Sequence, residues 1–232
     1  MSRSLRTLLA VVAVVAVVIV ALRLAGGDDE TGASSSEDAS SAPATVPPLP
    51  EDAPAEGLYV LSTVTDDGLV EVQTWLRSAQ PVSELTLTTS DPDLAPGGVE
   101  SLDLVVRSME NKVLARRDSV GTNPQRVRLR SPATDLYFSY TIDGGLSDAT
   151  ETVEGRGLVR VLGMDVSYDG EAGTVRRVIE VPGDVLSVAC LKPKEDFDAS
   201  PRPCGAATED GGWAVDLTGA DRQDRLLASI ES

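Results

Sequence analysis

Histidine is missing from this 232-residue chain. Its absence removes the commonest protein ligand for transition metals, the usual general base at neutral pH, and the Ser-His and Cys-His nucleophile pairs. The chain also lacks a Ser-x-x-Lys motif, a Gly-x-Ser-x-Gly motif and a glycine-rich phosphate loop. We therefore predict that the protein is not an enzyme. One catalytic alternative stays open, a secreted hydrolase that uses a pair of carboxylates, because the chain is rich in Asp and Glu.

Cysteine is scarce as well, since the chain contains only Cys190 and Cys204. There is no Cys-x-x-Cys motif and no histidine to activate a thiol, which argues against a redox site. We predict instead a disulfide between the two cysteines, which requires an oxidising compartment outside the cytoplasm. Closing a loop of about 15 residues would stabilise the fold by about 3 kcal/mol.

Basic residues are few relative to acidic ones. The 37 acidic residues outnumber the 20 basic ones, and the formal net charge is -17. This excess of negative charge repels nucleic acid and anionic lipid, so we expect no nucleic-acid partner. The few lysines, the many arginines and the abundance of Ala, Val and Gly are typical of a high-GC bacterial source.

One long apolar run stands near the start of the chain, at residues 7–25. As a helix, these 19 residues would extend about 28 Å, close to the thickness of a bilayer's hydrocarbon core. Arg3 and Arg6 precede the run and acidic residues follow it, which places the N-terminus in the cytoplasm. We predict a cytoplasmic tail at residues 1–6 and a single-pass signal-anchor at residues 7–25. The alternative is a cleaved signal peptide and a secreted protein, because the uninterrupted apolar core is short enough for one.

The next segment, residues 26–56, is acidic and rich in Ser and Pro, with very few large apolar side chains. Such a composition cannot form a core, so we predict a disordered linker that separates the membrane from the folded part.

From Leu58 onward, short β-branched runs are broken every 8 to 12 residues by Gly, Pro, Asp or Asn, which predicts an all-β fold. The number of predicted strands is too large for one seven-stranded unit. We therefore predict two packed β-sandwich-like units at residues 57–147 and 148–232, with one larger β-sandwich as the alternative. The predicted strands are 58–65, 69–77, 82–89, 99–108, 112–118, 125–130, 136–143, 158–168, 174–181, 185–191, 213–217 and 226–230. Asp169-Gly170 predicts a hairpin between the strands at 158–168 and 174–181.

A short pattern within residues 129–142 points to a known kind of domain. It consists of Leu129, Pro132, Thr134, Leu136, Phe138 and Tyr140. The pattern resembles the lead-in to the sixth strand of fibronectin type III and related immunoglobulin-like domains, where Leu, Pro, Thr and alternating apolar residues recur. The corner tyrosine of those domains would fall on Leu136, and Tyr137 comes one place late. The resemblance implies a β-sandwich for residues 57–147 and no particular activity, since such folds host many functions.

The clearest polar pattern is the alternation of Arg126, Arg128 and Arg130 with Val127 and Leu129. On a strand, this spacing puts three guanidinium groups on one face and the apolar pair on the core side. Such an arrangement is a candidate site for a carboxylate or phosphate polymer, or for the acidic strand of a partner. The alternative is a solvated face that pairs with Asp or Glu on neighbouring strands.

A second candidate site is the acidic cluster Glu195, Asp196 and Asp198, between the two cysteines. Carboxylates in extracellular loops often hold Ca²⁺, which prefers hard oxygen ligands. The spacing does not match the twelve-residue calcium loop, and the alternative is that these residues only keep the loop soluble. We predict no other cofactor.

Together these features predict a membrane-anchored, extracytoplasmic and non-catalytic β-domain protein with a binding or assembly role in the bacterial cell envelope. Its partners would be the membrane, through residues 7–25, and an envelope protein or polymer. The alternatives are an accessory subunit of a membrane transport or secretion complex and the carboxylate-pair hydrolase.

Overall fold

The computed structural model describes residues 45–89, 99–148, 156–170, 173–193 and 201–231. The predicted tail and membrane segment, together with the linker up to residue 44, lie outside these described residues. In the part of the chain that is described, no helix is long and apolar enough to cross a membrane. Residues 45–232 form one compact unit, and the description below concerns this unit alone.

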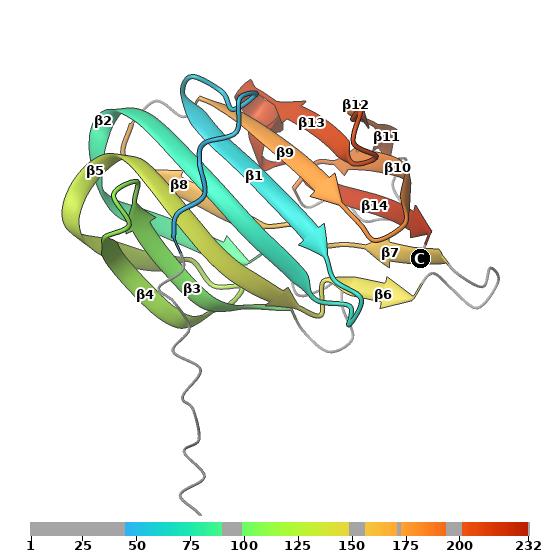
Figure 1. Cartoon of the computed structure of the whole chain (residues 1–232), viewed down its shortest axis with the longest axis horizontal. Helices are drawn as coiled ribbons and strands as arrows, with labels where there is room; N and C mark the ends of the chain where they lie inside the picture. Colours follow the sequence, from blue (N-terminus) through green and yellow to red (C-terminus); the bar gives the residue numbers. More distant parts are fainter. Residues whose placement is uncertain (1–44, 90–98, 149–155, 171–172, 194–200, 232) are drawn as a thin grey trace, which may run out of the picture. The chain divides into compact units, whose positions relative to one another are not determined.

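The fold is all-β, as the alternating sequence pattern predicted. Apart from one short 3-10 helix, the elements of the described residues are strands (Figure 1). They are β1 (Gly57–Val64), β2 (Val70–Thr89), β3 (Glu100–Ser108), β4 (Val113–Val120), β5 (Gln125–Asp143), β6 (Leu146–Asp148), β7 (Arg156–Val159), β8 (Met164–Tyr168), β9 (Thr174–Glu180), β10 (Asp184–Leu191), β11 (Arg202–Pro203), β12 (Ala206–Ala207), β13 (Trp213–Leu217), η2 (Gly219–Gln223) and β14 (Arg225–Glu231).

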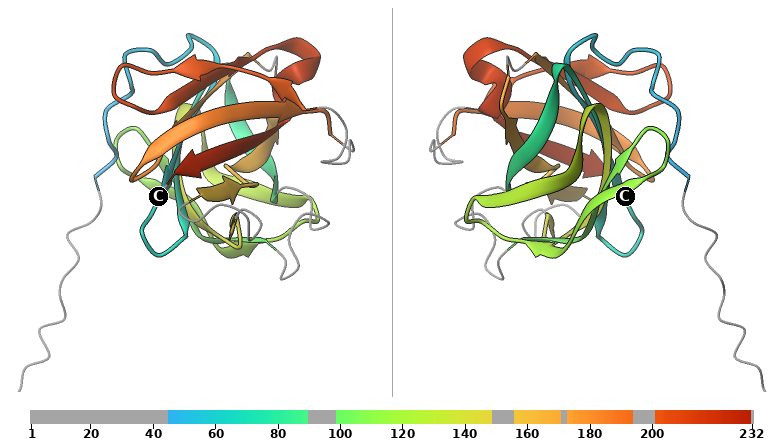
Figure 2. Two further views of the ribbon diagram at one scale, coloured as in Figure 1. Left: turned by 90° about the vertical axis from the view of Figure 1, so that its right-hand side faces the viewer. Right: turned by 90° about the vertical axis from the view of Figure 1, so that its left-hand side faces the viewer.

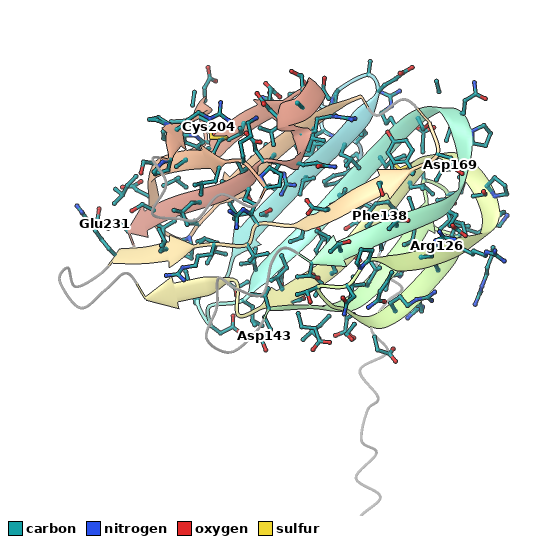
Figure 3. All side chains as sticks on the ribbon, turned by 180° about the vertical axis from the view of Figure 1, so that it is seen from behind. Arg126, Phe138, Asp143, Asp169, Cys204 and Glu231 are labelled. Atoms are coloured by element: carbon teal, nitrogen blue, oxygen red, sulfur yellow. A yellow bond between two sulfur atoms is a disulfide. The ribbon has the colours of Figure 1, made fainter. Side chains whose placement is uncertain are left out.

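The strands form two sheets. Sheet A has nine strands in the order β12-β13-β9-β1-β2-β5-β3-β4, with β8 also paired to β2. Sheet B has five strands in the order β11-β10-β14-β7-β6. One hydrophobic core contains residues from both sheets, including Leu58 of β1, Phe138 of β5 and Ile230 of β14. Phe138 is fully buried and lies within the fold (Figure 3).

The boundary predicted between residues 147 and 148 does not separate the strands of the two sheets. β9 and β13, which follow the boundary, join sheet A, while β6, which spans it, joins sheet B. Two strand pairings connect the halves within sheet A. β1 pairs with β9 in parallel, from Gly57 opposite Thr174 to Thr63 opposite Glu180, and β2 pairs with β8 in antiparallel orientation. Figure 2 shows the orange and red strands of the second half packed directly against the teal and green strands of the first.

Two of the predicted turns prove to be bends inside long strands. The segments predicted at 69–77 and 82–89 form the single strand β2, and those at 125–130 and 136–143 form β5. The pairing of β2 with β5 shifts register between Arg77 and Glu84, the region that contains Pro81. Proline is tolerated at such irregular positions because no regular ladder hydrogen bond is required there. Proline therefore marks a bend in β2 rather than its end.

The prediction of a hairpin at Asp169-Gly170 is wrong, because the strands on its two sides do not pair with each other. β8 pairs with β2, whereas β9 pairs with β1 and β13. β9 instead begins close to the start of β1, at Gly57. The φ of Gly57 is 122°, and a Cβ on this residue would lie 1.9 Å from the carbonyl oxygen of Thr174. Because only glycine fits so close to another backbone, Gly57 permits β1 and β9 to start side by side.

The expectation of a disordered linker does not hold for residues 45–56. Val46, Leu49 and Ala53 pack against an aromatic cluster on sheet A, and Asp52 forms an ion pair with Arg176 of β9. These contacts make residues 45–56 part of the folded unit.

Candidate functional site

A pocket of about 440 Å³ lies between the inner side of sheet A and the start of β14. β1, β2, β8 and β9 line one side of it, and η2 and the first residue of β14 line the other. Its volume lies in the range of about 300–1,000 Å³ that is typical of small-molecule sites.

Apolar side chains from three strands form much of the pocket wall. Leu58 and Val60 come from β1, Val175 from β9, and Met164 and Val166 from β8. Leu58, Val60 and Val175 point to the core side because side chains alternate along a strand and Tyr59 and Arg176 point outward. An apolar ligand surface would therefore contact a preformed wall.

Arg177 of β9 is the most unusual residue of this wall. It has the same orientation as Val175 and Ile179, so its guanidinium group lies on the core side of sheet A, and the residue is only 7% exposed. Among the described residues, its Nε atom has no hydrogen-bond partner. Its nearest ion-pair partner is Asp165 of β8, with 3.9 Å between Nη2 and Oδ1. Arg177 is therefore a buried cation with spare hydrogen-bonding capacity in the wall of a pocket.

Asp165 compensates Arg177 only in part. Half of the surface of its side chain remains exposed, which screens the attraction between the two charges. Desolvation raises the pKa of Asp165, and the positive charges of Arg177 and Arg225 oppose this shift. The half-exposed carboxylate therefore faces the cation at a distance longer than a good hydrogen bond.

Two further arginines line the opposite side of the pocket. Arg222 of η2 donates through Nε to the carbonyl oxygen of Gly219 and through Nη1 to that of Gly173, at 3.1 and 3.4 Å. Arg225 of β14 donates through Nη2 to the carbonyl oxygen of Lys192, at 3.4 Å. These contacts hold both guanidinium groups in place. We call this cavity the arginine pocket. Among its described lining residues, Arg177, Arg222 and Arg225 carry positive charges and Asp165 carries a negative charge.

The predicted alternation at Arg126, Arg128 and Arg130, which we call the arginine ladder, is confirmed. All three side chains are exposed, while Val127 and Leu129 are buried. Arg126 lies at the edge of the ribbon and points away from it (Figure 3).

The ladder is only partly compensated by negative charge. Glu84 of β2 pairs with both Arg126 and Arg128, at 3.9 and 3.1 Å, and their side chains stay 79% and 85% exposed. In the described residues, no ion pair involves Arg130. Arg126 is the cross-strand partner of Thr86, which lines the arginine pocket, so the ladder begins beside the rim of the pocket.

The predicted disulfide between Cys190 and Cys204 is present, with 5.8 Å between the Cα atoms (Figure 3). Cys190 lies in β10 and Cys204 directly follows β11. The three acidic residues predicted to bind calcium, Glu195, Asp196 and Asp198, lie outside the described residues. Within the described ranges, no group of three or more His, Cys, Asp or Glu side chains could hold a metal ion.

The sequence patterns did not identify the arginine pocket, although one signal was present. In the run Thr174–Glu180, the apolar residues Val175 and Ile179 have the same orientation, and Arg177 lies between them. A charged residue on the apolar side of an alternating strand is costly unless it has a partner or a ligand. That conflict could have marked Arg177. Nothing local marks Asp165, Arg222 or Arg225, because their proximity depends on the fold.

No family model and no curated protein matches the chain. Among solved structures, the fold is distantly similar to an aminopeptidase N family protein from Idiomarina loihiensis, with 14% sequence identity and a TM-score of 0.36. The match covers 74% of this chain and 29% of that one, so this chain spans less than a third of its length.

Proposed function

We propose that this protein is an extracytoplasmic, non-catalytic binding protein of the bacterial cell envelope, anchored through residues 7–25. Its ligand is a small amphipathic anion that carries a carboxylate or a similar group and is held in the arginine pocket. The observation that supports this proposal is the buried guanidinium group of Arg177, whose Nε atom has no hydrogen-bond partner among the described residues.

The chemistry of the pocket favours an anion with an apolar body. A carboxylate would add a second negative charge beside Arg177, whose ion pair with Asp165 is long, and guanidinium groups bind carboxylates through paired hydrogen bonds. Leu58, Val60 and Val175 would contact the apolar part of the ligand. The arginine ladder beside the rim would raise the local concentration of anions on a chain that otherwise repels them.

The sequence supports both the proposed extracytoplasmic location and the proposed lack of catalysis. The apolar run at residues 7–25, with basic residues before it and acidic residues after it, favours an anchor with the folded unit outside. The disulfide in the folded unit agrees with an oxidising compartment. The lack of histidine and of a nucleophile motif favours binding over turnover. The fibronectin type III resemblance, the accessory-subunit role and the hydrolase role remain predictions from sequence.

Two fluorescent probes of nearly the same shape test the ligand class. 1-Anilinonaphthalene-8-sulfonate carries one negative charge on an apolar body, and N-phenyl-1-naphthylamine lacks that charge. The protein used is a fragment of residues 45–232, which contains every residue of both hydrophobic clusters. We expect the fragment to bind the anionic probe at least tenfold more tightly than the neutral one, because only the anion contacts the guanidinium groups.

A matched pair of variants locates the binding. Arg222→Gln removes one positive charge from the pocket lining, and Arg116→Gln removes one from an exposed position on β4 that does not line the pocket. We expect the first variant to weaken the anionic probe at least threefold and the second to leave it unchanged. Equal affinity for the two probes, or equal effects of the two variants, would refute the proposed ligand class.

A further inference from the structure

A row of three aromatic rings lies on the outer side of sheet A, on the opposite side of β1 from the arginine pocket. Tyr59 of β1 is opposite Trp75 of β2, and Trp75 is opposite Tyr137 of β5. The ring centroids of Tyr59 and Trp75 are 5.7 Å apart and those of Trp75 and Tyr137 are 5.3 Å apart, both in edge-on geometry. We call these three residues the aromatic row. Although it lies on the side of the sheet away from the main core, each of its members is at least nine-tenths buried.

Residues 45–53, which we call the strap, cover the aromatic row. Figure 1 shows this blue segment crossing β2 and β1 before it enters β1. Val46, Leu49 and Ala53 pack on the cluster that contains the row. The indole Nε1 of Trp75 donates a hydrogen bond to the carbonyl oxygen of Pro47, at 3.3 Å.

The strap contacts the sheet with the period of a polyproline II helix. Thr45, Pro48 and Glu51 are exposed, whereas the pairs between them, residues 46–47 and 49–50, are half-buried. A repeat of three residues is that of polyproline II, and the prolines at 47, 48 and 50 favour this conformation in themselves and in the residues before them. Val46 and Leu49, three residues apart, pack on the aromatic cluster, and each is followed by a half-buried proline.

Charge fixes the far end of the strap. Nε of Arg176 lies 2.8 Å from Oδ2 of Asp52, while Nη1 of the same arginine lies 2.7 Å from Oδ2 of Asp216 on β13. Burial and the nearby charge of Asp52 raise the pKa of Tyr59 to about 12. The aromatic row and Arg176 together therefore match a peptide with a Pro-x-x-Pro core and an acidic residue two places after it.

We propose that the aromatic row with Arg176 is a binding site for proline-rich, acidic peptide segments, that the strap is its resident ligand, and that a partner protein with a Pro-x-x-Pro-x-Asp segment replaces the strap there. Aromatic grooves that bind proline-rich peptides use the same features: a preformed extended ligand, rings that contact apolar-proline pairs, and a hydrogen bond to a ligand carbonyl. The site is independent of the arginine pocket, which opens on the other side of β1.

Competition between the strap and a peptide of the same chemistry provides the test. The probe is a fluorescein-labelled peptide with the sequence of residues 44–54, and the protein is the full chain in lipid nanodiscs. The strap is attached to β1, so its effective concentration is on the order of 1 mM. A peptide with an intrinsic Kd of about 100 µM would therefore bind the unaltered chain about tenfold more weakly than a chain with a weakened strap.

The weakened chain carries Val46→Ser and Leu49→Ser, which remove two side chains that contact the aromatic cluster. The matched control carries Thr45→Ser and Glu51→Gln at exposed positions of the same strap. By fluorescence anisotropy we expect the weakened chain to bind the peptide at least fivefold more tightly than the unaltered chain, and the control to behave as the unaltered chain. A peptide with alanine in place of both apolar-paired prolines should bind at least fivefold more weakly.

Three results would overturn the proposal. One is a weakened chain that keeps its circular dichroism spectrum and melting temperature but does not bind the peptide. Another is equal binding of the peptide and its alanine counterpart, which would indicate general apolar adhesion. The third is a dimer in which the strap of one copy covers the row of another while peptide has no effect. If the weakened chain does not fold, Asp52→Lys replaces it, and unchanged peptide affinity in that variant would overturn the proposal equally.

Discussion

Replacing Arg177 by methionine should leave the fold intact while it removes anion binding. The pair with Asp165, at 3.9 Å, contributes at most about 4 kcal/mol at an effective dielectric constant of about 20, and less because half of the Asp165 side chain is exposed. Burial of the guanidinium costs several kcal/mol, and its unpaired Nε adds about 1–3 kcal/mol. These opposing contributions nearly cancel. Methionine has similar length and no charge, so Arg177→Met should keep or raise the free energy of unfolding by about 1–2 kcal/mol.

The assay for this variant has two measurements. For a domain of this size, 1 kcal/mol corresponds to a change of about 2–4 °C in melting temperature, so we expect Tm to stay constant or to rise by up to about 8 °C. Affinity for 1-anilinonaphthalene-8-sulfonate should fall at least tenfold, and affinity for N-phenyl-1-naphthylamine should not fall. A drop in stability of more than about 2 kcal/mol together with unchanged affinity for the anionic probe would refute the reasoning, because Arg177 would then serve the fold rather than a ligand.

Two further predictions concern stability. Cys190→Ser combined with Cys204→Ser should lower the free energy of unfolding by about 3 kcal/mol and Tm by about 6–12 °C, measured by thermal melts without reductant; a loss below about 1 kcal/mol would contradict the loop-entropy argument. The pKa of Tyr59 is raised from 10.0 to about 12, so between these pH values the unfolded chain loses this proton before the folded one. The stability that the neutral tyrosine contributes is therefore complete below pH 10 and is lost as the pH rises to 12. Between pH 9 and 12, the free energy of unfolding measured in urea should fall by up to about 2–3 kcal/mol more in the unaltered chain than in Tyr59→Phe. An equal fall in the two chains would show that the strap does not bury this hydroxyl.

Some elements could be predicted because their cause is local. The exposure of Arg126, Arg128 and Arg130 follows from the two-residue period of a strand, and it holds whichever strands are its neighbours. The disulfide could be predicted because the chain offers only one pair of cysteines. Other predictions failed where the same residue type has two uses: Pro81 marks a bend in β2 rather than its end, and Asp169-Gly170 does not join paired strands.

The strap shows why composition alone misled for residues 45–56. A segment with four prolines and few apolar residues cannot form a core of its own, and that part of the reasoning holds. It becomes ordered because Tyr59, Trp75 and Tyr137 lie side by side on neighbouring strands and provide the surface that the strap lacks. A row of rings from three strands is invisible in a one-dimensional pattern, since its members are 16 and 62 positions apart (75 − 59 and 137 − 75).

Local pattern was sufficient to predict that the folded unit is all-β, how side chains are oriented along the strand at residues 125–130, and which cysteines pair, because each of these depends on neighbours in the chain or on a single possible partner. The choice of strand partners was decided only on folding. The parallel contact of β1 with β9 joins residues more than a hundred positions apart, and it brings Arg177 and Leu58 into one wall opposite Arg222. Such pairings are selected by the burial of a common core, to which every strand contributes, and no short stretch of sequence contains that information.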